Sequence, residues 1–374
     1  MTKIFLVRHG EAEGNYYRRC QGQIDAPLTP CGRLQAEALK ERFAAADIAA
    51  VYASDLQRAR DTVAIASGQS VNTDKRLREV CFGIWEGQGW GNLSREYPEE
   101  IRNFLFAPYR FTAPGAETLH AVRERMETAL LEIGARHEGE SVMVGSHGMA
   151  IRVLAAKLMG LASERLDEIR TPSNTAVALL VYEDGRLRVE SYNDTDHLPE
   201  SLRGSGKRKW LDENGFADTN LRFETMDLEK ERRLFLDCYE DAWRTVHGHL
   251  RGFDELACWL GALCRARASE RAVQSVWKGD TFAGILALDE LRGEHHGYGW
   301  VSFLYLVPEL RGEGLGIQLI GEAMSRYREL GRKSIRLCTA PHNPALGFYE
   351  HLGFVRCGSE PGATGELIRL EKEL

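Results

Sequence analysis

Apolar and polar positions in the first half of the chain form a repeating pattern. Short, continuous apolar runs at residues 4–7, 50–53 and 141–144 are each followed by a stretch with helical spacing. Runs of this length without polar alternation are typical of strands buried on both faces of a parallel sheet. The pattern therefore predicts an α/β fold, with helices near Asp55 and Met149.

The pattern changes towards residue 200. An apolar run at 177–182 and a more polar segment at 187–192 are joined by Asp184-Gly185, which predicts a hairpin turn. Polarity then rises sharply from about residue 200 to 219, where the chain reads GSGKRK and later DENG. We interpret 201–219 as a linker whose basic run is solvated, between domains at 1–200 and 220–374.

A second periodic region begins near Leu221. Helices are expected at 228–246, 253–267, 315–330 and 345–352, and strands at 273–277, 282–288, 300–307, 335–338, near 354 and at 366–370. Helices and strands here do not alternate as regularly as in the first half. The second domain is thus expected to differ from the first in its fold.

Size and charge narrow the class of protein. A chain of 374 residues exceeds what one hydrophobic core usually supports, in agreement with two domains. The formal net charge of −7 argues against general binding to nucleic acid, which needs a basic surface. Because no window reaches the roughly 18 apolar residues of a membrane span and the N-terminus reads as a strand, we expect a cytoplasmic protein that does not enter membranes.

The eight cysteines show no CxxC pair and no histidine spacing suited to zinc, so free thiols and no bound metal are expected. Three of them, Cys20, Cys31 and Cys81, flank the motifs discussed next. Redox-sensitive thiols are the alternative to small buried apolar side chains at these positions.

Three strand-to-helix transitions carry basic side chains: Arg8-His9, Arg58 in SDLQRAR, and His147 in GSHG. Because the carboxyl ends of parallel strands meet at one edge of a sheet, these groups are expected to gather there. Ser54 or Asp55 would cap the second helix and place Arg58 in its first turns, where an anion is favoured. Paired arginine donors suit a phosphoryl group.

A neutral histidine in such a cluster would attack phosphorus, and His9 is the candidate nucleophile. Fixed cations supply the charge stabilisation that phosphoryl transfer needs, so this chemistry requires no metal. Glu79 in LREVCFGIWEG is the candidate general acid and base, with Glu86 as the competing choice.

The first 200 or so residues resemble the histidine phosphatase superfamily, the phosphoglycerate-mutase-like proteins. The motifs LVRHGE, QGQIDAPLTPCGRLQA, YASDLQRARDT, LREVCFGIWEG and GSHG occur in the family's order. The resemblance implies a three-layer αβα fold, a phosphohistidine at His9 and proton donation by Glu79. The residues it implies for binding the phosphoryl group and substrate are Arg8, Asn15, Gln21, Gly22, Arg58 and His147.

Two features bear on the family's chemistry. In the family, the residue at the position of Ala12 usually has a side-chain hydroxyl group. Because alanine has none, one polar contact is missing here. The family's mutases are longer in the middle than this domain, which favours a phosphatase over a mutase. Aromatic residues and arginines between 85 and 118 would either form a lid over the organic part of the substrate or pack in the core.

The stretch FLYLVPELRGEGLGIQLI combines a strand, a turn at Pro308 and a glycine-rich opening of a helix. Such a turn lets successive N–H groups surround a pyrophosphate. With NPALGFYEHLGF downstream, the region from about Leu221 onwards resembles the GNAT-type N-acetyltransferases, which implies an α+β fold with a mixed sheet. Acetyl-CoA would be the cofactor and a small-molecule amine the acceptor.

This second resemblance implies roles for particular residues. Those implied to bind acetyl-CoA are Leu306, Val307, Arg311, Gly312, Gly314, Leu315, Gly316 and Asn343. Tyr349 would protonate the departing thiolate, a role suited to a tyrosine with the usual pKa near 10. Phe303 lies where many family members carry a glutamate, so the base is unassigned; the candidates on the preceding loop are Glu290, Glu294, His295 and His296.

The sequence therefore predicts a bifunctional enzyme: a metal-independent phosphatase acting on a small phosphate ester, fused to an N-acetyltransferase. A phosphoglycerate-type mutase in the first domain is one alternative. A non-catalytic sensor of phosphate esters or coenzyme A is the other.

Overall fold

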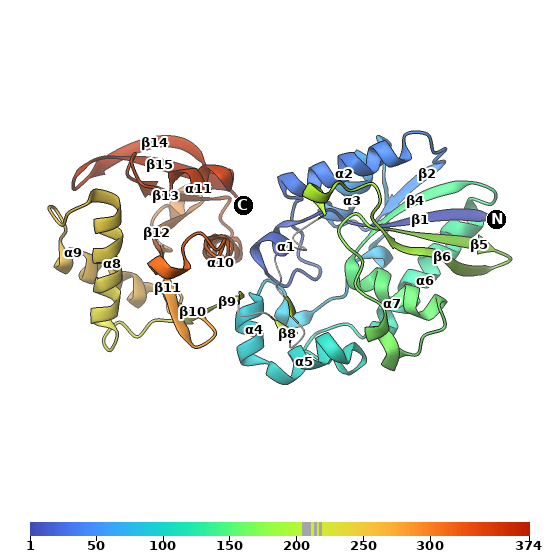
Figure 1. Ribbon diagram of the computed structural model, residues 1–374, viewed down its shortest axis with the longest axis horizontal. Helices are drawn as coiled ribbons and strands as arrows, with labels where there is room; N and C mark the ends of the chain where they lie inside the picture. The colour runs from blue at the N-terminus through green and yellow to red at the C-terminus, as the bar shows by residue number, and fades with distance from the viewer. Residues whose placement is uncertain (204–210, 213–214, 217–218) are drawn as a thin grey trace. The chain divides into compact units, whose positions relative to one another are not determined.

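The computed structural model describes residues 1–203, 211–212, 215–216 and 219–374. Its internal contacts divide the chain into a first unit, Met1–Ala217, and a second unit, Asp218–Leu374. Figure 1 shows a sheet with helices packed against it in each unit. The GSGKRK run of the predicted linker lies outside the described residues, and around it the structure has a short 3-10 helix, Glu200–Leu202, and the paired strands β7 (Leu211–Asp212) and β8 (Gly215–Phe216).

In the described part of the first unit, six strands form one sheet in the order β3-β2-β4-β1-β5-β6. The strands are β1 (Thr2–Arg8), β2 (Ala50–Ala53), β3 (Asn72–Thr73), β4 (Ser141–Ser146), β5 (Val177–Glu183) and β6 (Arg186–Asp194). The helices are α1 (Glu13–Tyr17), α2 (Pro30–Phe43), α3 (Gln57–Ser67), α4 (Trp90–Glu96), α5 (Pro98–Phe106), α6 (Leu119–Arg136) and α7 (Gly148–Leu158). The first four strands run parallel, and β5 and β6 run antiparallel to their neighbours.

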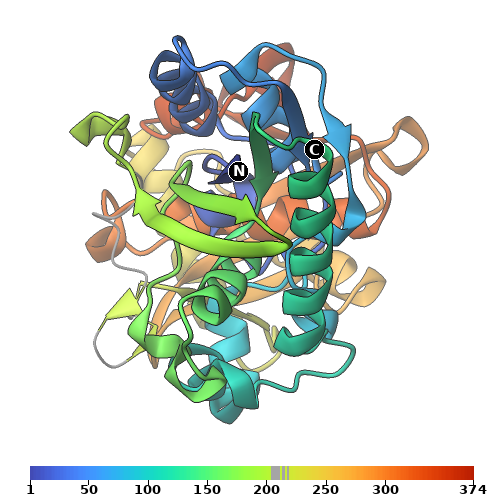
Figure 2. The same cartoon turned by 90° about the vertical axis from the view of Figure 1, so that its right-hand side faces the viewer.

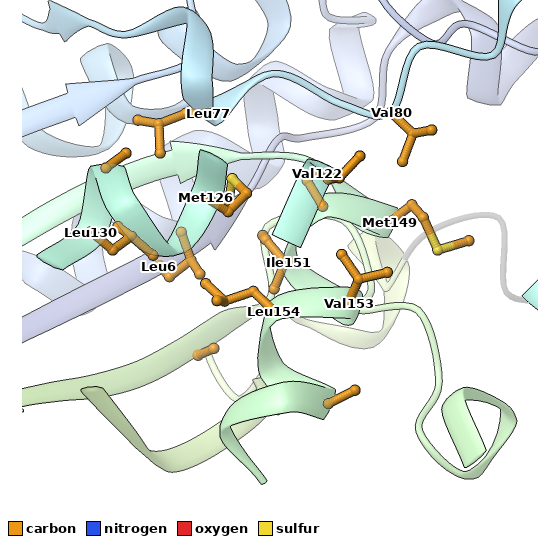
Figure 3. Close-up of a cluster of buried hydrophobic side chains, with 14 of the residues drawn as sticks. Leu6, Leu77, Val80, Val122, Met126, Leu130, Met149, Ile151, Val153 and Leu154 are labelled. Atoms are coloured by element: carbon orange, nitrogen blue, oxygen red, sulfur yellow. The ribbon is translucent and has the colours of Figure 1, made fainter. Parts of the chain in front are cut away.

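The continuous apolar run of β1 is explained by helices on both faces of the sheet. Ile4 and Leu6 point into a core shared with α6 and α7, of which Figure 3 shows a part, including Leu6, Met126 and Leu154. Phe5 and Val7, one position along, pack with residues of α2 and α3 on the opposite face. The predicted three-layer αβα fold is confirmed.

The predicted hairpin at Asp184-Gly185 is also confirmed. Both residues have left-handed backbone conformations, with φ of 48° and 77°, as the two central residues of a type I′ turn require. The turn joins β5 to β6, which forms an edge of the sheet (Figure 2).

Among the described residues of the second unit, seven strands form a mixed sheet in the order β14-β15-β13-β12-β11-β10-β9. The strands are β9 (Leu221–Thr225), β10 (Val273–Lys278), β11 (Thr281–Asp289), β12 (Tyr298–Leu306), β13 (Ser334–Thr339), β14 (Val355–Gly362) and β15 (Gly365–Glu373). The helices are α8 (Arg232–His247), α9 (Glu255–Ala268), α10 (Gly316–Glu329) and α11 (Leu346–His351). Only β12 and β13 pair in parallel, so the expectation of a mixed sheet is confirmed.

Aromatic side chains attach the helices of the second unit to its sheet. Phe235 of α8 and Trp259 of α9 share a core with Ile285 of β11. Tyr327 of α10 is fully buried and donates a hydrogen bond of 2.6 Å to the carbonyl of Trp300. Gly299 is required beneath this ring, because a Cβ atom there would lie 2.2 Å from it.

The strands β12 and β13 diverge after a short paired segment. Their register covers only Tyr298, Gly299 and Trp300 on β12, opposite Ser334, Ile335 and Arg336 on β13. In the described chain, the rest of β12 therefore has no ladder on that side, although its other edge pairs with β11 as far as Leu306. Unpaired backbone N–H and C=O groups are thus available where β12 approaches the glycine-rich turn.

No helix in the described part of the chain has the length and apolar character needed to cross a membrane.

Candidate active sites

His9 and His147 occupy equivalent positions at the carboxyl ends of two adjacent parallel strands. Arg8 of β1 pairs in register with Ser146 of β4, so the residues that follow each strand come together. The backbone N–H of His9 donates to the carbonyl of Ser146 at 3.0 Å. The centroids of the two imidazole rings lie 5.2 Å apart, and both side chains are buried.

One hydrogen bond determines which nitrogen of His9 carries a proton. Nδ1 of His9 lies 2.7 Å from the carbonyl oxygen of Gly10. A carbonyl only accepts hydrogen bonds, so Nδ1 must be the protonated nitrogen. In the neutral ring the lone pair is then on Nε2, which is the tautomer that a nucleophilic histidine needs.

The two arginines predicted to bind phosphate are held by backbone carbonyls instead of carboxylates. Arg58 is buried, and its Nη1 and Nη2 donate to the carbonyls of Ile24 and Gly22 at 2.8 and 2.7 Å. Arg8 donates from Nη1 to the carbonyl of Pro172 at 2.5 Å. This arrangement fixes the guanidinium groups in place without cancelling their charge.

Arg58 lies in the first turn of α3, as expected, but the predicted caps are wrong. The N-cap residue is Leu56, and the N–H of Gln57 donates to the carboxylate of Asp25 at 2.7 Å. Asp55 instead binds Arg78 through both carboxylate oxygens. A distant loop thus supplies the acid that the helix end favours.

Burial and the neighbouring positive charges keep the two histidines uncharged. Burial, followed by the charges of Arg58 and Arg8, holds the pKa of His9 well below 6.5. Burial and the same arginines, together with His9, hold the pKa of His147 well below its usual range too. Burial lowers the pKa of Arg58 to about 10, so this arginine stays protonated at neutral pH.

Several buried donors in this region have no partner within the described chain. They are Nε of Arg8, Nε of Arg58 and Nε2 of Gln21; the two ring nitrogens of His147, one of which is a donor in the neutral ring, also have no partner there. An anion with several oxygens would satisfy such a set, because unpaired buried donors are costly. Arg8, His9, Gln21 and Arg58 line a cavity of about 710 Å³, a size that fits a small molecule.

Glu79 lines the same cavity and is oriented by the start of α7. Its carboxylate accepts from the N–H groups of Met149 at 3.1 Å and Ala150 at 2.9 Å. Glu86 has a different task, since its Oε1 accepts from the N–H groups of Phe82 and Gln23, both at 2.9 Å. The geometry therefore favours Glu79 over Glu86 as the group that exchanges protons with a substrate.

The remaining predicted substrate residues also lie at the cavity. Asn15 and Gly22 line it. Oδ1 of Asn15 accepts from the N–H of Ala12, and the carbonyl of Gly22 accepts from Arg58. The side chain of Ala12 is buried.

The aromatic segment between residues 85 and 118 supplies both a core and a wall. Trp85 is fully buried, with its ring centroid 4.8 Å from that of Phe111. Trp90 and Phe104 stack with centroids 5.7 Å apart, and both line the cavity. Phe106 remains half exposed. Packing in the core is thus confirmed for this segment, and Trp90 and Phe104 also form part of the cavity wall, whereas the lid role stays a prediction.

Two residues that sequence reasoning missed hold the backbone of His9. Nδ2 of Asn174 and the N–H of Thr175 donate to its carbonyl at 3.1 and 3.3 Å. Thr175 is buried with a φ of 55°, a conformation that costs a β-branched residue of order 1–3 kcal/mol. No local pattern in the sequence marks these residues.

Further arginines line the cavity and were also missed. They are Arg18, Arg19, Arg152, Arg170 and Arg203. Arg152 is buried in helix α7, where Lys157 is the other charged residue, and it donates to the carbonyls of Ile169 and Leu166. A charged residue in such a helix is the signal that could have identified it.

In the second unit, the glycine-rich turn leads from the end of β12 into α10. Gly312 and Gly314 have left-handed φ values of 83° and 74°, and Gly316 is the first residue of the 14-residue helix. The first N–H groups of a helix have no partner within it. The turn therefore has the form expected of a pyrophosphate cradle.

Four residues predicted to bind the cofactor form hydrogen bonds within the protein. Nη2 of Arg311 donates to Asp241 at 2.7 Å, and its Nε donates to the carbonyl of Leu306 at 2.9 Å. Asn343 donates to Thr339 and accepts from the N–H of Ala345. The N–H of Val307 donates to the carbonyl of Ala283 at 3.0 Å, so it completes the ladder with β11.

Tyr349 lies on α11 and is buried between aromatic neighbours, with ring centroids 5.3 Å from Phe348 and 5.7 Å from Phe354. Burial raises its pKa to about 12, above the value near 10 assumed from the sequence. The phenol thus stays protonated at neutral pH. It is a weaker acid by about 3 kcal/mol than an exposed tyrosine.

The loop candidates for the acceptor base are poorly suited to that role. Glu290 forms an ion pair with Arg326 at 2.7 Å, and Glu294 forms one with Arg332 at 3.2 Å. His295 and His296 are exposed in a short 3-10 helix, Glu294–His296. The base must therefore be sought elsewhere.

All eight cysteines are free thiols, as expected. In the described part of the chain, no group of three or more His, Cys, Asp or Glu side chains is arranged to hold a metal ion.

Comparison with known proteins agrees with this geometry. The family model described as "Histidine phosphatase superfamily (branch 1)" matches residues 4–195. The chain belongs to the histidine phosphatase superfamily. A second model, "Acetyltransferase (GNAT) family", matches residues 228–354, so the second unit carries a GNAT acetyltransferase domain.

Relatives that match about half of this chain are named for different activities. Phosphoserine phosphatase 1 of Hydrogenobacter thermophilus is 30% identical over 203 residues, 54% of this chain and 96% of that protein. Phosphoglycerate mutase-like protein 4 of Arabidopsis thaliana is 34% identical over 207 residues, 54% of this chain and 88% of that protein. The structure of YhfR from Bacillus stearothermophilus is 32% identical, with a TM-score of 0.51, and the match covers 53% of this chain and 99% of that one.

We predict that His9 and His147 remain neutral at pH 6.5, where an ordinary histidine is half protonated. The pKa of each lies well below that value because of burial and the two arginines. Nitrogen-15 NMR of the histidine rings checks this. The unfolded chain would bind protons that these folded rings reject, so the free energy of unfolding should fall as the pH drops below about 6.5. A His9 ring that titrates near pH 6.5 would contradict the arrangement.

Proposed function

We propose that the first unit hydrolyses small phosphate monoesters through a phosphohistidine at His9, without a metal ion. The observation that carries this proposal is the buried neutral imidazole with its lone pair on Nε2, beside Arg8, Arg58 and His147. The donors without partners in this cluster are the groups that a phosphoryl anion would satisfy.

The reaction would proceed in two displacements. Nε2 of His9 attacks phosphorus, the ester bond breaks, and Glu79 gives a proton to the leaving oxygen. Glu79 then takes a proton from a water molecule, which attacks the phosphohistidine and releases inorganic phosphate. Arg8, Arg58 and His147 stabilise the charge on the phosphoryl oxygens in both steps, which is the role a metal has in other phosphoryl transfer enzymes.

The lining of the cavity suits a substrate whose organic part has both apolar and polar groups. Trp90 and Phe104 form an apolar wall, and the five additional arginines contribute positive charge around the space. Hydrolysis is favoured over mutase chemistry because the segment over the site is short, with α4 and α5 spanning only 7 and 9 residues. Steady phosphate release without exchange between two phosphorylated acids would distinguish hydrolysis from mutase activity.

We also propose that the second unit transfers an acetyl group from acetyl-CoA to a small-molecule amine. The turn from Arg311 to Gly316 would hold the pyrophosphate, and the unpaired edge of β12 would bind the pantetheine arm. Tyr349 would give its proton to the thiolate as the C–S bond breaks. A protein that binds both ligands without turnover would instead be a sensor.

His9→Ala should lower the hydrolysis of an aryl phosphate by about 10³-fold or more, because the nucleophile is lost. Release of 4-nitrophenol measures this. The matched control is His120→Ala, which removes an exposed histidine of the same unit and should leave the rate unchanged. Activity should also persist in EDTA, and dependence on added metal would defeat the mechanism.

Glu79→Gln should slow hydrolysis of an alkyl phosphate by about 10²-fold. It should slow 4-nitrophenyl phosphate much less, because that leaving group needs little protonation. Initial rates on both substrates measure the ratio. Glu86→Gln should affect the two substrates alike, since Glu86 only holds backbone N–H groups. If Glu79→Gln slows both substrates equally, the proton transfer belongs to Glu86.

Tyr349→Phe should lower the rate of acetyl transfer by about 10²-fold while the affinity for acetyl-CoA stays nearly constant. The first quantity is measured by thiol release and the second by calorimetry. Tyr298→Phe is the control, because its ring contacts Arg336 at the paired end of β12. Loss of acetyl-CoA binding in Tyr349→Phe would indicate a structural role instead.

A further inference from the structure

The peptide unit between His9 and Gly10 is held at both of its polar groups. Nδ2 of Asn174 and the N–H of Thr175 donate to the carbonyl of His9 at 3.1 and 3.3 Å. The N–H of Gly10 donates to Oγ1 of Thr62 at 2.9 Å. The orientation of this peptide matters to the ring, because the carbonyl of Gly10 accepts the hydrogen bond from Nδ1 of His9.

Thr175 adopts a backbone conformation that its side chain disfavours. Its φ is 55°, in the left-handed region, where a β-branched residue is an outlier. Such a conformation persists only where the surrounding structure holds it. The hydroxyl of Thr175 donates to the carbonyl of Asn174 at 2.8 Å and lies 3.0 Å from Nε2 of His197. Because Thr175 is fully buried, its conformation depends on these neighbours and not on water.

The hydrogen bonds of Thr175 determine the tautomer of His197. The hydroxyl gives its one hydrogen to the carbonyl of Asn174, so it must accept a hydrogen from Nε2 of His197. The lone pair of the neutral ring is then on Nδ1, which faces Nη1 of Arg42 at 3.5 Å. Burial and the charge of Arg42 lower the pKa of His197 to about 4, so the ring keeps this form at neutral pH.

Two elements of the fold fix the other side of the His197 ring. Arg42 lies in the last turn of α2, and its Nη2 donates at 2.6 Å to Asp194, the last residue of β6. His197 itself lies in the turn that follows β6. Neither His197 nor Thr175 is among the described residues that line the cavity. Any influence of His197 on the cavity therefore passes through the residues between them.

We propose that His197 is a positioning residue for hydrolysis in the first unit. Its Nε2–H holds the hydroxyl of Thr175, the strained backbone of Thr175 holds the carbonyl of His9, and the imidazole of His9 is thereby aligned with the phosphoryl group. The inference rests on the proposed phosphohistidine mechanism, because a nucleophile must lie in line with the bond that it breaks.

The test compares His197→Leu with His197→Gln in the full chain, with 4-nitrophenyl phosphate as substrate. A glutamine amide repeats the pattern of the neutral ring, with an N–H donor for Thr175 and an acceptor for Arg42, whereas leucine has neither. His197→Leu should lower kcat by about 10-fold or more, and His197→Gln should stay within about threefold of the unaltered protein. The inhibition constant of inorganic phosphate should change less than about twofold in both variants, because Arg8 and Arg58 are anchored by other carbonyl groups.

His137→Leu is the matched control for a loss of stability. It removes a second partly buried ring of the same unit, which hydrogen bonds to Tyr52 at 2.9 Å and to Glu140 at 2.7 Å. This ring lies beside the amino end of β4, whereas His147 follows the carboxyl end of that strand. The control should therefore melt at a lower temperature but keep its kcat. An equal loss of kcat in the control would show that only stability is affected and would overturn the proposal.

Substitutions at Thr175 test the connection itself. Thr175→Val removes the hydroxyl that His197 holds and should lower kcat as much as His197→Leu does, which gives a second route if His197→Leu does not fold. Thr175→Gly adopts the left-handed conformation without strain and keeps the N–H that donates to His9. In that background, addition of His197→Leu should change kcat by less than about twofold.

The possible results separate this inference from the proposed function. Full kcat in His197→Leu, no rescue by His197→Gln, or losses that multiply in the Thr175→Gly background would each overturn the role of His197. An unaltered protein that releases no 4-nitrophenol would instead contradict the proposed hydrolysis.

Discussion

The first unit depends on one short hydrogen bond, from Nδ1 of His9 to the carbonyl of the next residue. It fixes the tautomer of a ring whose pKa is lowered first by burial and then by the neighbouring arginines, so that the ring stays uncharged. A charged ring could not act as a nucleophile, and a ring with its proton on Nε2 would present no lone pair. The strained Thr175 and its neighbour Asn174 hold the backbone at this point. Packing, backbone strain and electrostatics together keep the lone pair on Nε2 of His9 available.

The second unit relies on a different constraint, the separation of two parallel strands. Because β12 and β13 pair over three residues only, the remaining backbone of β12 is available to a ligand. Helix α8 contacts Arg311 of the glycine-rich turn through Asp241, and His342 of the loop after β13 through His247. The same helix thus connects the glycine-rich turn with the loop after β13.

The sequence predicted those parts of the site that follow from local pattern. Strand runs bounded by glycine placed Arg8, His9 and His147 at one sheet edge, because parallel strands must align their carboxyl ends. Contacts between distant segments were not predictable in this way. The Asp25 cap of α3 comes from a loop, and Asp55, which looked like the cap, binds Arg78. The contact between His247 and His342 was not predicted for the same reason, since these residues come together only in the folded chain.

The way in which the arginines of the first unit are anchored has a consequence for turnover. Arg8 and Arg58 are held by carbonyl groups, so their full charge remains directed at the cavity after the ester has gone. Inorganic phosphate presents the same oxygens as the substrate did. In the proposed hydrolysis, departure of the product would therefore compete with the same attraction that binds the ester, and free phosphate would compete with the substrate for the cavity.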